Sequence, residues 1–148
     1  MHMKTVAELL KSKSVNSVFS IAPDASVLDA VKLMAEKNIG ALLITKDGEL
    51  VGIFTERDYS RKLVLAGLSS KDTPVRDVMT ANVMYVRPTQ TNEECMALMT
   101  ENRMRHLPVM DNGRLLGLLS IGDLVKDIMS EQQFTIKQLE HYISGQGY

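Results

Sequence analysis

The chain has 148 residues, which suits one domain or two small domains that share a core. Its net charge is −1, so it lacks the basic surface typical of proteins that bind DNA or RNA. One cysteine excludes an internal disulfide, and a reducing cytoplasm is the expected setting. The N-terminus has no long apolar run, so neither a signal peptide nor a membrane span is expected. The histidines His2, His106 and His141 have no metal-ligand spacing.

The first part of the chain is predicted to contain a helix, a strand, a second helix and a β-hairpin, in that order. The first helix lies within residues 1–15, and a short strand is expected at Val18–Ile21. The second helix begins at Ser26, where Asp29 three residues later makes a capping-box pattern. Two apolar runs around Asp47-Gly48 are typical of a hairpin.

The hairpin leads into the stretch GIFTERDY, Gly52–Tyr59, which is a further capping-box candidate. Thr55 would accept a hydrogen bond from the first turn of the following helix, and Asp58 would accept from the backbone N–H of Thr55. The same helix start offers N–H groups and the positive end of the helix dipole, which suit a phosphate. The glycine would let a ligand approach the strand backbone. The residues alone leave both interpretations open.

The chain contains an internal repeat. Shifting it by 65 residues aligns Val18–Asp58 with Val83–Asp123 without a gap, which indicates duplication. Residues 67–80 between the copies are rich in turn-forming residues and are predicted to be a linker.

The second copy is expected to have the elements of the first. These are a strand at Val83–Val86, a helix from Thr91, a hairpin around Asn112-Gly113 and a helix after the motif GLLSIGDL, which contains Ser120 and Asp123. Each repeat is therefore expected to be β-α-β-β-α. Two such repeats packed sheet to sheet, with pseudo-two-fold symmetry, would make an α+β fold with enough buried surface.

The predicted boundaries follow from the repeat. They are an N-terminal helix at 1–15, repeat 1 at 16–66, a linker at 67–80, repeat 2 at 81–129 and a C-terminal helical extension at 130–148. The extension places Phe134, Leu139, Tyr142 and Ile143 partly on one face, which would cover the module or pack on a partner chain.

The span Val18–Val125 resembles a tandem pair of cystathionine-β-synthase (CBS) domains, a Bateman module, of the free-standing bacterial type. The stretches RHLPVMDNGRLLGLLSIGDLV and GIFTERDY carry this resemblance. It implies two related clefts that bind adenine nucleotides: AMP above all, or ADP, ATP, NAD or S-adenosylmethionine. In such modules the Thr or Ser meets phosphate, the Asp meets ribose, and the other repeat supplies the base pocket.

By this resemblance, one cleft uses Thr55 and Asp58 and the other uses Ser120 and Asp123. The walls of the first are expected to be Val83, Met84, Met104, Arg105, His106 and Pro108. Those of the second are Val18, Phe19, Ile39, Gly40 and Ala41, which carry no charge. A charge-assisted contact from Arg105 is worth roughly 1.5–3 kcal/mol, so tighter phosphate binding is predicted at the first cleft.

Some polar residues keep two interpretations. Arg57 is either a solvated surface residue or a further phosphate contact, and His106 is either structural or a ligand contact. Cys95 is expected to be buried and inert.

The predicted function is a non-catalytic sensor of an adenine nucleotide, acting as a homodimer on an unknown protein effector. The alternative is a protein-interaction module, for example a regulator of redox proteins as implied by some plant relatives, with nucleotide binding secondary. An enzyme is least favoured, because the sequence has no nucleophile–base pair, metal set or P-loop. Metal, nucleic acid and membrane are not expected as partners.

Overall fold

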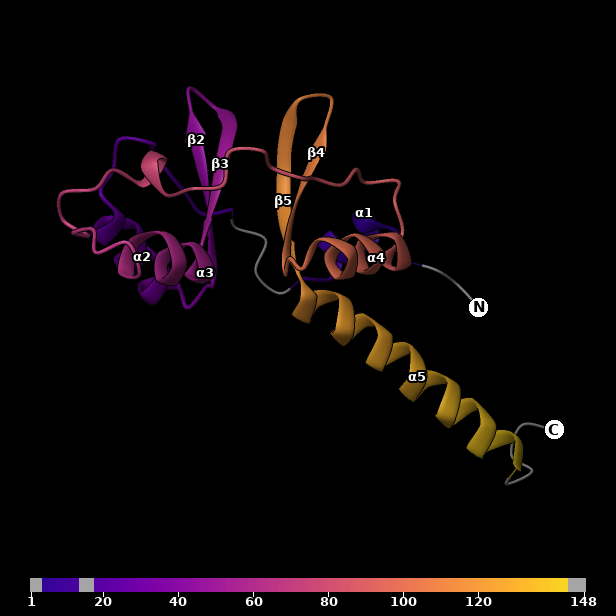
Figure 1. The fold of residues 1–148 in the computed structure, drawn as a ribbon. Coiled ribbons are helices and arrows are strands. Elements are labelled where there is room, and N and C mark those ends of the chain that lie inside the picture. The colour runs from indigo at the N-terminus through magenta and orange to yellow at the C-terminus, as the bar shows by residue number, and fades with distance from the viewer. Residues whose placement is uncertain (1–3, 14–17, 144–148) are drawn as a thin grey trace. The chain divides into compact units, whose positions relative to one another are not determined.

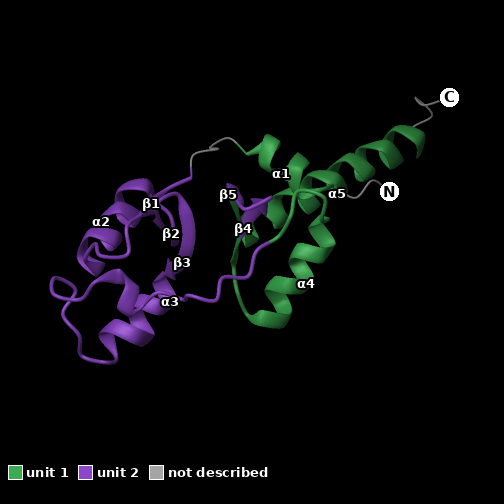
Figure 2. Ribbon diagram, turned by 90° about the horizontal axis from the view of Figure 1, so that it is seen from above, with its two compact units in different colours: residues 1–16, 86–107, 118–148 green, residues 17–85, 108–117 purple. Residues whose placement is uncertain are grey.

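The computed structural model describes residues 4–13 and 18–143, which divide between two compact units (Figures 1 and 2). Unit 1, green in Figure 2, covers residues 1–16, 86–107 and 118–148. Unit 2, purple, covers residues 17–85 and 108–117. Unit 2 therefore holds the first repeat and the segment that follows it, together with most of the second repeat's hairpin.

Unit 2 contains a three-stranded sheet built from the first repeat. β1 (Ser20–Ile21) pairs in parallel with β2 (Ala41–Lys46), and β2 pairs antiparallel with β3 (Glu49–Thr55). Asp47 and Gly48 form the turn between β2 and β3 with φ values of 52° and 81°. Two successive positive φ values are what a tight two-residue hairpin turn requires, so the predicted hairpin is confirmed.

One helix covers the core of this sheet. α2 (Val27–Lys37) begins at the predicted cap, where the backbone N–H of Asp29 donates to Ser26 Oγ at 3.1 Å. It contacts β2 and ends where Asn38 turns to a left-handed φ of 55°. The buried core of unit 2 consists of Val27, Ala30, Met34, Leu42, Ile44, Phe54, Leu63, Val75 and Val78.

The segment 67–80, expected as a linker, is packed into unit 2. Val75 is fully buried, begins a single 3₁₀ turn (η2, Val75–Asp77), and donates its N–H to the carbonyl of Ala25 at 2.7 Å. Thr80 exchanges both backbone hydrogen bonds with Ile53 of β3, at 3.0 and 2.8 Å. The segment is therefore held by the first repeat along much of its length.

Unit 1 is built around helices. α1 (Val6–Ser12) and α4 (Asn92–Asn102) both contact α5 (Ile121–Ile143). The predicted N-terminal helix is thus confirmed, and its cap is a complete box in which Thr5 and Glu8 exchange hydrogen bonds.

The second hairpin is also present. β4 (His106–Asp111) and β5 (Arg114–Ser120) form a two-stranded sheet, and Asn112 and Gly113 at its turn have φ values of 51° and 77°. The predicted strand at Val83–Val86 is wrong, because only Val86 has a single bridge. Val83, Met84 and Tyr85 have no regular secondary structure, and the boundary between the two units follows Tyr85.

α5 continues without a break from the helix expected after the second motif into the expected C-terminal extension (Figure 1). Leu124 and Asp127 in its first turns are buried. Every side chain from Gln132 to Ile143 is exposed. Across residues 4–13 and 18–143, no helix combines the length and apolar character needed to span a membrane.

Candidate functional site

The first motif lies where β3 passes into α3 (Glu56–Asp58), and it forms a complete capping box. Thr55 Oγ1 accepts from the backbone N–H of Asp58 at 3.2 Å. Asp58 Oδ2 accepts in return from the Thr55 backbone N–H at 3.0 Å and from its hydroxyl at 3.2 Å. The capping interpretation of this motif is therefore confirmed, with hydroxyl and carboxylate side by side at a helix start.

The second carboxylate oxygen of Asp58 is also occupied. Asp58 Oδ1 accepts from Thr80 Oγ1 at 3.3 Å and lies 3.1 Å from Lys62 Nζ. The Asp58 side chain is 8% exposed, whereas that of Lys62 is 45% exposed. A ligand hydroxyl would have to displace one of these groups, and Lys62 is the easier one because its own side chain is largely exposed and can turn into solvent.

The helix after this motif differs from the regular helix expected. Residues Tyr59–Val64 form a π-helical segment, η1, in which the N–H of Leu65 donates to the carbonyl of Ser60, five residues back, at 3.1 Å. Such wide turns are rare and are frequent at functional sites. Hydrophobic spacing does not reveal them, because the register changes by only one residue.

The glycine of the first motif serves the fold. A Cβ at Gly52 would collide with the side-chain sulfur of Met79 and lie 3.1 Å from the carbonyl oxygen of Thr80. The space beside Gly52, which was expected to admit a ligand, is therefore filled by the chain's own Met79 and Thr80.

The second motif lies where β5 passes into α5, and it repeats the box. Ser120 donates its backbone N–H to Asp123 Oδ2 at 2.8 Å, and the N–H of Asp123 donates to Ser120 Oγ at 3.2 Å. Lys13 follows α1 and places its Nζ 3.0 Å from Asp123 Oδ2, while donating to the carbonyl of Leu118 at 2.7 Å. The side chain of Asp123 is 23% exposed, so its carboxylate is more accessible than that of Asp58.

In each repeat a backbone carbonyl accepts a hydrogen bond from the first N–H of the motif helix. Glu56 N donates to the carbonyl of Gly40 at 3.2 Å, and Ile121 N donates to that of Arg105 at 2.8 Å. Gly40 and Arg105 therefore each adjoin the motif of their own repeat through their backbone. The helix starts consequently offer one fewer free N–H than the isolated pattern suggests.

Asp123 lines a cavity of about 410 Å³ that lies within unit 1. Its lining residues are Lys4, Leu9, Ser12, Lys13, Asp123, Lys126, Asp127 and Ser130. Lys4 pairs with Asp127 and Lys13 pairs with Asp123, so the lining has one positive charge in excess, from Lys126. The volume falls in the range of small-molecule pockets. None of the predicted walls of the second cleft lines this cavity, so their neutral character stays a prediction. The lysines lie outside the aligned segment Val83–Asp123 and could not be seen by comparing the repeats.

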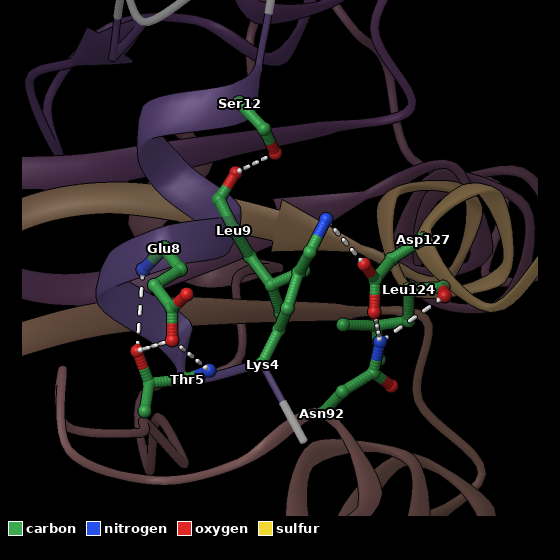
Figure 3. A network of polar contacts seen from close by, with 8 residues as sticks. All are labelled: Lys4, Thr5, Glu8, Leu9, Ser12, Asn92, Leu124 and Asp127. Atoms are coloured by element: carbon green, nitrogen blue, oxygen red, sulfur yellow. Dashed lines mark hydrogen bonds and ion pairs between the residues drawn. The ribbon is translucent and has the colours of Figure 1, made fainter. Parts of the chain in front are cut away.

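A buried polar network supports one side of this cavity (Figure 3). The side-chain amide of Asn92 donates to Asp127 Oδ2 at 2.7 Å and to the carbonyl of Leu124 at 3.2 Å. Lys4 Nζ lies 3.0 Å from Asp127 Oδ1, and this bond raises the pKa of Lys4 above its usual 10.5. The network joins the residues before α1 to α4 and α5, and Asn92 was not singled out from the sequence.

The other predicted site residues are distributed over both units. Unit 2 contains Thr55 and Asp58 together with Val18, Phe19, Ile39, Gly40, Ala41, Arg57, Val83, Met84 and Pro108. Unit 1 contains Ser120 and Asp123 together with Met104, Arg105 and His106. Each predicted cleft draws on both units, so the composition of the complete clefts stays a prediction.

Comparison with known families identifies the repeats. The family model described as "CBS domain" matches residues 5–65 and 75–132. The chain belongs to the CBS domain family. The two matches confirm the expected pair of CBS repeats and the α+β class.

Related CBS proteins cover nearly the whole chain. A putative signal-transduction protein with CBS domains from Burkholderia ambifaria is 57% identical, with a TM-score of 0.85 over 90% of this chain and 99% of that one. The mitochondrial CBS domain-containing protein CBSX3 of Arabidopsis thaliana is 41% identical over 97% of this chain and 73% of its own length. A hexameric CBS-CP12 protein from bloom-forming cyanobacteria is 29% identical, with a TM-score of 0.73 over 84% and 71% of the two chains.

Two further features bear on the chemistry of this CBS protein. Within the described residues, no cluster of three or more His, Cys, Asp or Glu side chains has a geometry that would hold a metal ion. Cys95 is fully buried on α4, as expected, and burial raises the pKa of its thiol to about 11. A thiol with that pKa is a poor nucleophile at neutral pH.

Proposed function

We propose that this CBS protein is a non-catalytic regulatory module that binds an adenine nucleotide, AMP most favourably. The observation that carries the proposal is the complete capping box at the end of both β3 and β5, which sets a hydroxyl and a carboxylate at each helix start. In that arrangement a hydroxyl donates to phosphate, and a carboxylate accepts from the two ribose hydroxyls.

In this proposal Thr55 and Ser120 contact phosphate, and Asp58 and Asp123 contact ribose. Arg105 and Arg57 remain proposed phosphate contacts at the first cleft. We place the stronger site at Ser120 and Asp123, in contrast to the order expected from Arg105 alone. Asp123 is the more exposed carboxylate, and the lining of the cavity beside it has one positive charge in excess, from Lys126.

The regulatory output is proposed to pass from a cytoplasmic homodimer to a separate protein effector, with neither nucleic acid nor membrane involved. A ligand can bias such a module only by the difference in its affinity for two states. Nucleotides other than AMP, namely ADP, ATP, NAD and S-adenosylmethionine, are the competing ligands. A related CBS-CP12 protein is hexameric, which supports self-association of this chain as part of the proposal.

The protein-interaction alternative has one observation in its favour. Both oxygens of Asp58 are already bound by the chain's own Thr55, Thr80 and Lys62, so this carboxylate has a structural role without any ligand. In that case the first motif would hold the fold, and the surface of the module would recognise a partner protein.

A thermal-shift screen with AMP, ADP, ATP, NAD and S-adenosylmethionine tests the proposal. A ligand at 100 times its Kd stabilises a protein by about 2.7 kcal/mol, which corresponds to roughly 5–10 °C in Tm at this chain length. We expect AMP to give the largest rise and the recovered nucleotide to be chemically unchanged. If none of the five raises Tm, nucleotide sensing is excluded and the interaction alternative stands.

A further inference from the structure

Each motif carboxylate has a lysine beside it, but the two lysines come from different parts of the chain. Lys62 Nζ lies 3.1 Å from Asp58 Oδ1 and is four residues further along the chain, in η1. Four residues after Asp123 the chain has Asp127, so the helix of the second motif supplies no equivalent lysine there. Lys13, the residue after α1, places its Nζ 3.0 Å from Asp123 Oδ2 instead. The second motif is thereby tied to the N-terminal helix.

Lys13 fills the last acceptor position on one oxygen of Asp123. Asp123 Oδ2 accepts the backbone N–H of Ser120 at 2.8 Å as well as the ammonium group of Lys13. A carboxylate oxygen has about two lone pairs, so Oδ2 is saturated. Across residues 4–13 and 18–143, no group donates a hydrogen bond to Asp123 Oδ1. One ribose hydroxyl can therefore bind Oδ1 and leave the protein undisturbed, whereas a second hydroxyl on Oδ2 has to replace Lys13.

The two ends of α1 are held in different ways. Backbone hydrogen bonds of Val6 and Ala7 fix its start to the segment before α4, at 2.8 and 3.0 Å. Lys4, just before α1, also pairs with the buried Asp127 (Figure 3). At the other end, Lys13 reaches the second motif through a side chain that is 24% exposed. A ligand at the second motif therefore acts on the end of α1 and leaves its start in place.

We propose that Lys13 is a latch between α1 and the second motif, and that a nucleotide with both ribose hydroxyls opens it. The two hydroxyls take both oxygens of Asp123, Lys13 leaves the carboxylate, and the end of α1 loses this anchor. A nucleotide with a single ribose hydroxyl binds Oδ1 and leaves the latch closed. The inference rests on the nucleotide site of the proposed function. It adds the element that reports occupancy of that site, and a means of distinguishing ribose from deoxyribose.

Acetylation of lysines, followed by mass spectrometry of the full chain's peptides, tests the latch. Saturating AMP should speed acetylation of Lys13 by about 5-fold, the upper end for a partly exposed ion pair. Lys4 is the internal control and should keep its rate, because its partner Asp127 lies outside the motif. Saturating 2′-deoxyadenosine monophosphate should leave both rates unchanged. Asp123→Asn, with no nucleotide present, should speed acetylation of Lys13 as AMP does.

Titration calorimetry measures the same competition as a ratio of affinities, in which the contribution of the phosphate cancels. At the tighter site, Lys13→Met should raise the ratio of AMP affinity to 2′-deoxyadenosine monophosphate affinity by about 5-fold, because the second hydroxyl no longer competes with an ammonium group. The matched control is Lys126→Met, which removes another lysine from the lining of the same cavity and should keep the natural ratio.

The outcomes separate the latch from the nucleotide site. If AMP binds and the acetylation of Lys13 does not change, the latch is overturned and the nucleotide proposal stands. An unchanged affinity ratio in Lys13→Met, or slow acetylation of Lys13 in Asp123→Asn, also overturns the latch. If AMP does not bind at all, the nucleotide proposal and the ligand-driven opening fail together.

Discussion

Replacing Asp58 by alanine tests how firmly the first motif holds the fold. The substitution removes the acceptor for the backbone N–H and hydroxyl of Thr55, for Thr80 Oγ1 and for Lys62 Nζ. Loss of a capping interaction costs about 0.5–2 kcal/mol, and loss of a buried hydrogen bond to a charged group costs about 1.5–3 kcal/mol. The exposed Lys62 pair adds little. We expect Asp58→Ala to lower the free energy of unfolding by about 2–4 kcal/mol.

The assay is urea unfolding followed by circular dichroism, with Asp29→Ala as the matched control. Asp29 occupies the same N3 position in α2, where the cap described is the single bond from its N–H to Ser26 Oγ, and it is exposed. Alanine keeps that N–H, so we expect a loss below about 0.5 kcal/mol, as for most surface changes. If the two variants lose the same free energy, the carboxylate of Asp58 does not hold the first motif together.

Two further substitutions test the packing beside the motifs. Gly52→Ala should lower the free energy of unfolding by about 1–3 kcal/mol in urea titrations, because its Cβ would press on the carbonyl of Thr80. The control Gly122→Ala in α5 meets only ordinary contacts and should raise the free energy of unfolding by roughly 0.5–1 kcal/mol. Equal effects of the two substitutions would contradict the close approach at Gly52. Lys4→Met should cost about 1.5–3 kcal/mol at pH 7 by removing the ion pair to Asp127. The pKa of Lys4 in the folded protein is raised above 10.5. The difference in free energy of unfolding between natural and variant protein should therefore be complete below about pH 10 and disappear as the pH rises through that raised pKa. A difference in free energy that does not depend on pH would contradict the ion pair.

Much of the fold is predictable because its signals are local and occur twice. The turns at Asp47-Gly48 and Asn112-Gly113 follow from residues that tolerate positive φ, and both hairpins form. The boxes at Thr55 and Ser120 depend on a spacing of three residues, and both are complete. Such features need no knowledge of distant contacts.

Contacts between distant segments could not be predicted from the sequence. The burial of Val75 depends on a core that residues 67–80 reach only in the folded chain. Lys13 reaches Asp123 from the residue after α1, outside the repeat, so comparing the two copies could not reveal it. The role of Gly52 depends on Thr80, which is distant in the sequence and paired with β3. These contacts change which motif is expected to bind phosphate more tightly.

Titration calorimetry with AMP on matched carboxylate variants measures whether the two capping boxes bind the nucleotide. Asp58→Asn and Asp123→Asn keep the shape of each box and remove the charge that would accept from ribose, and Asp29→Asn is the control. A charge-assisted hydrogen bond corresponds to about one to two decades of affinity. We predict that Asp123→Asn weakens the tighter site by about 10- to 100-fold, that Asp58→Asn weakens the other site, and that Asp29→Asn binds like the natural protein. Unchanged AMP affinity in both motif variants would mean that neither carboxylate contacts the nucleotide.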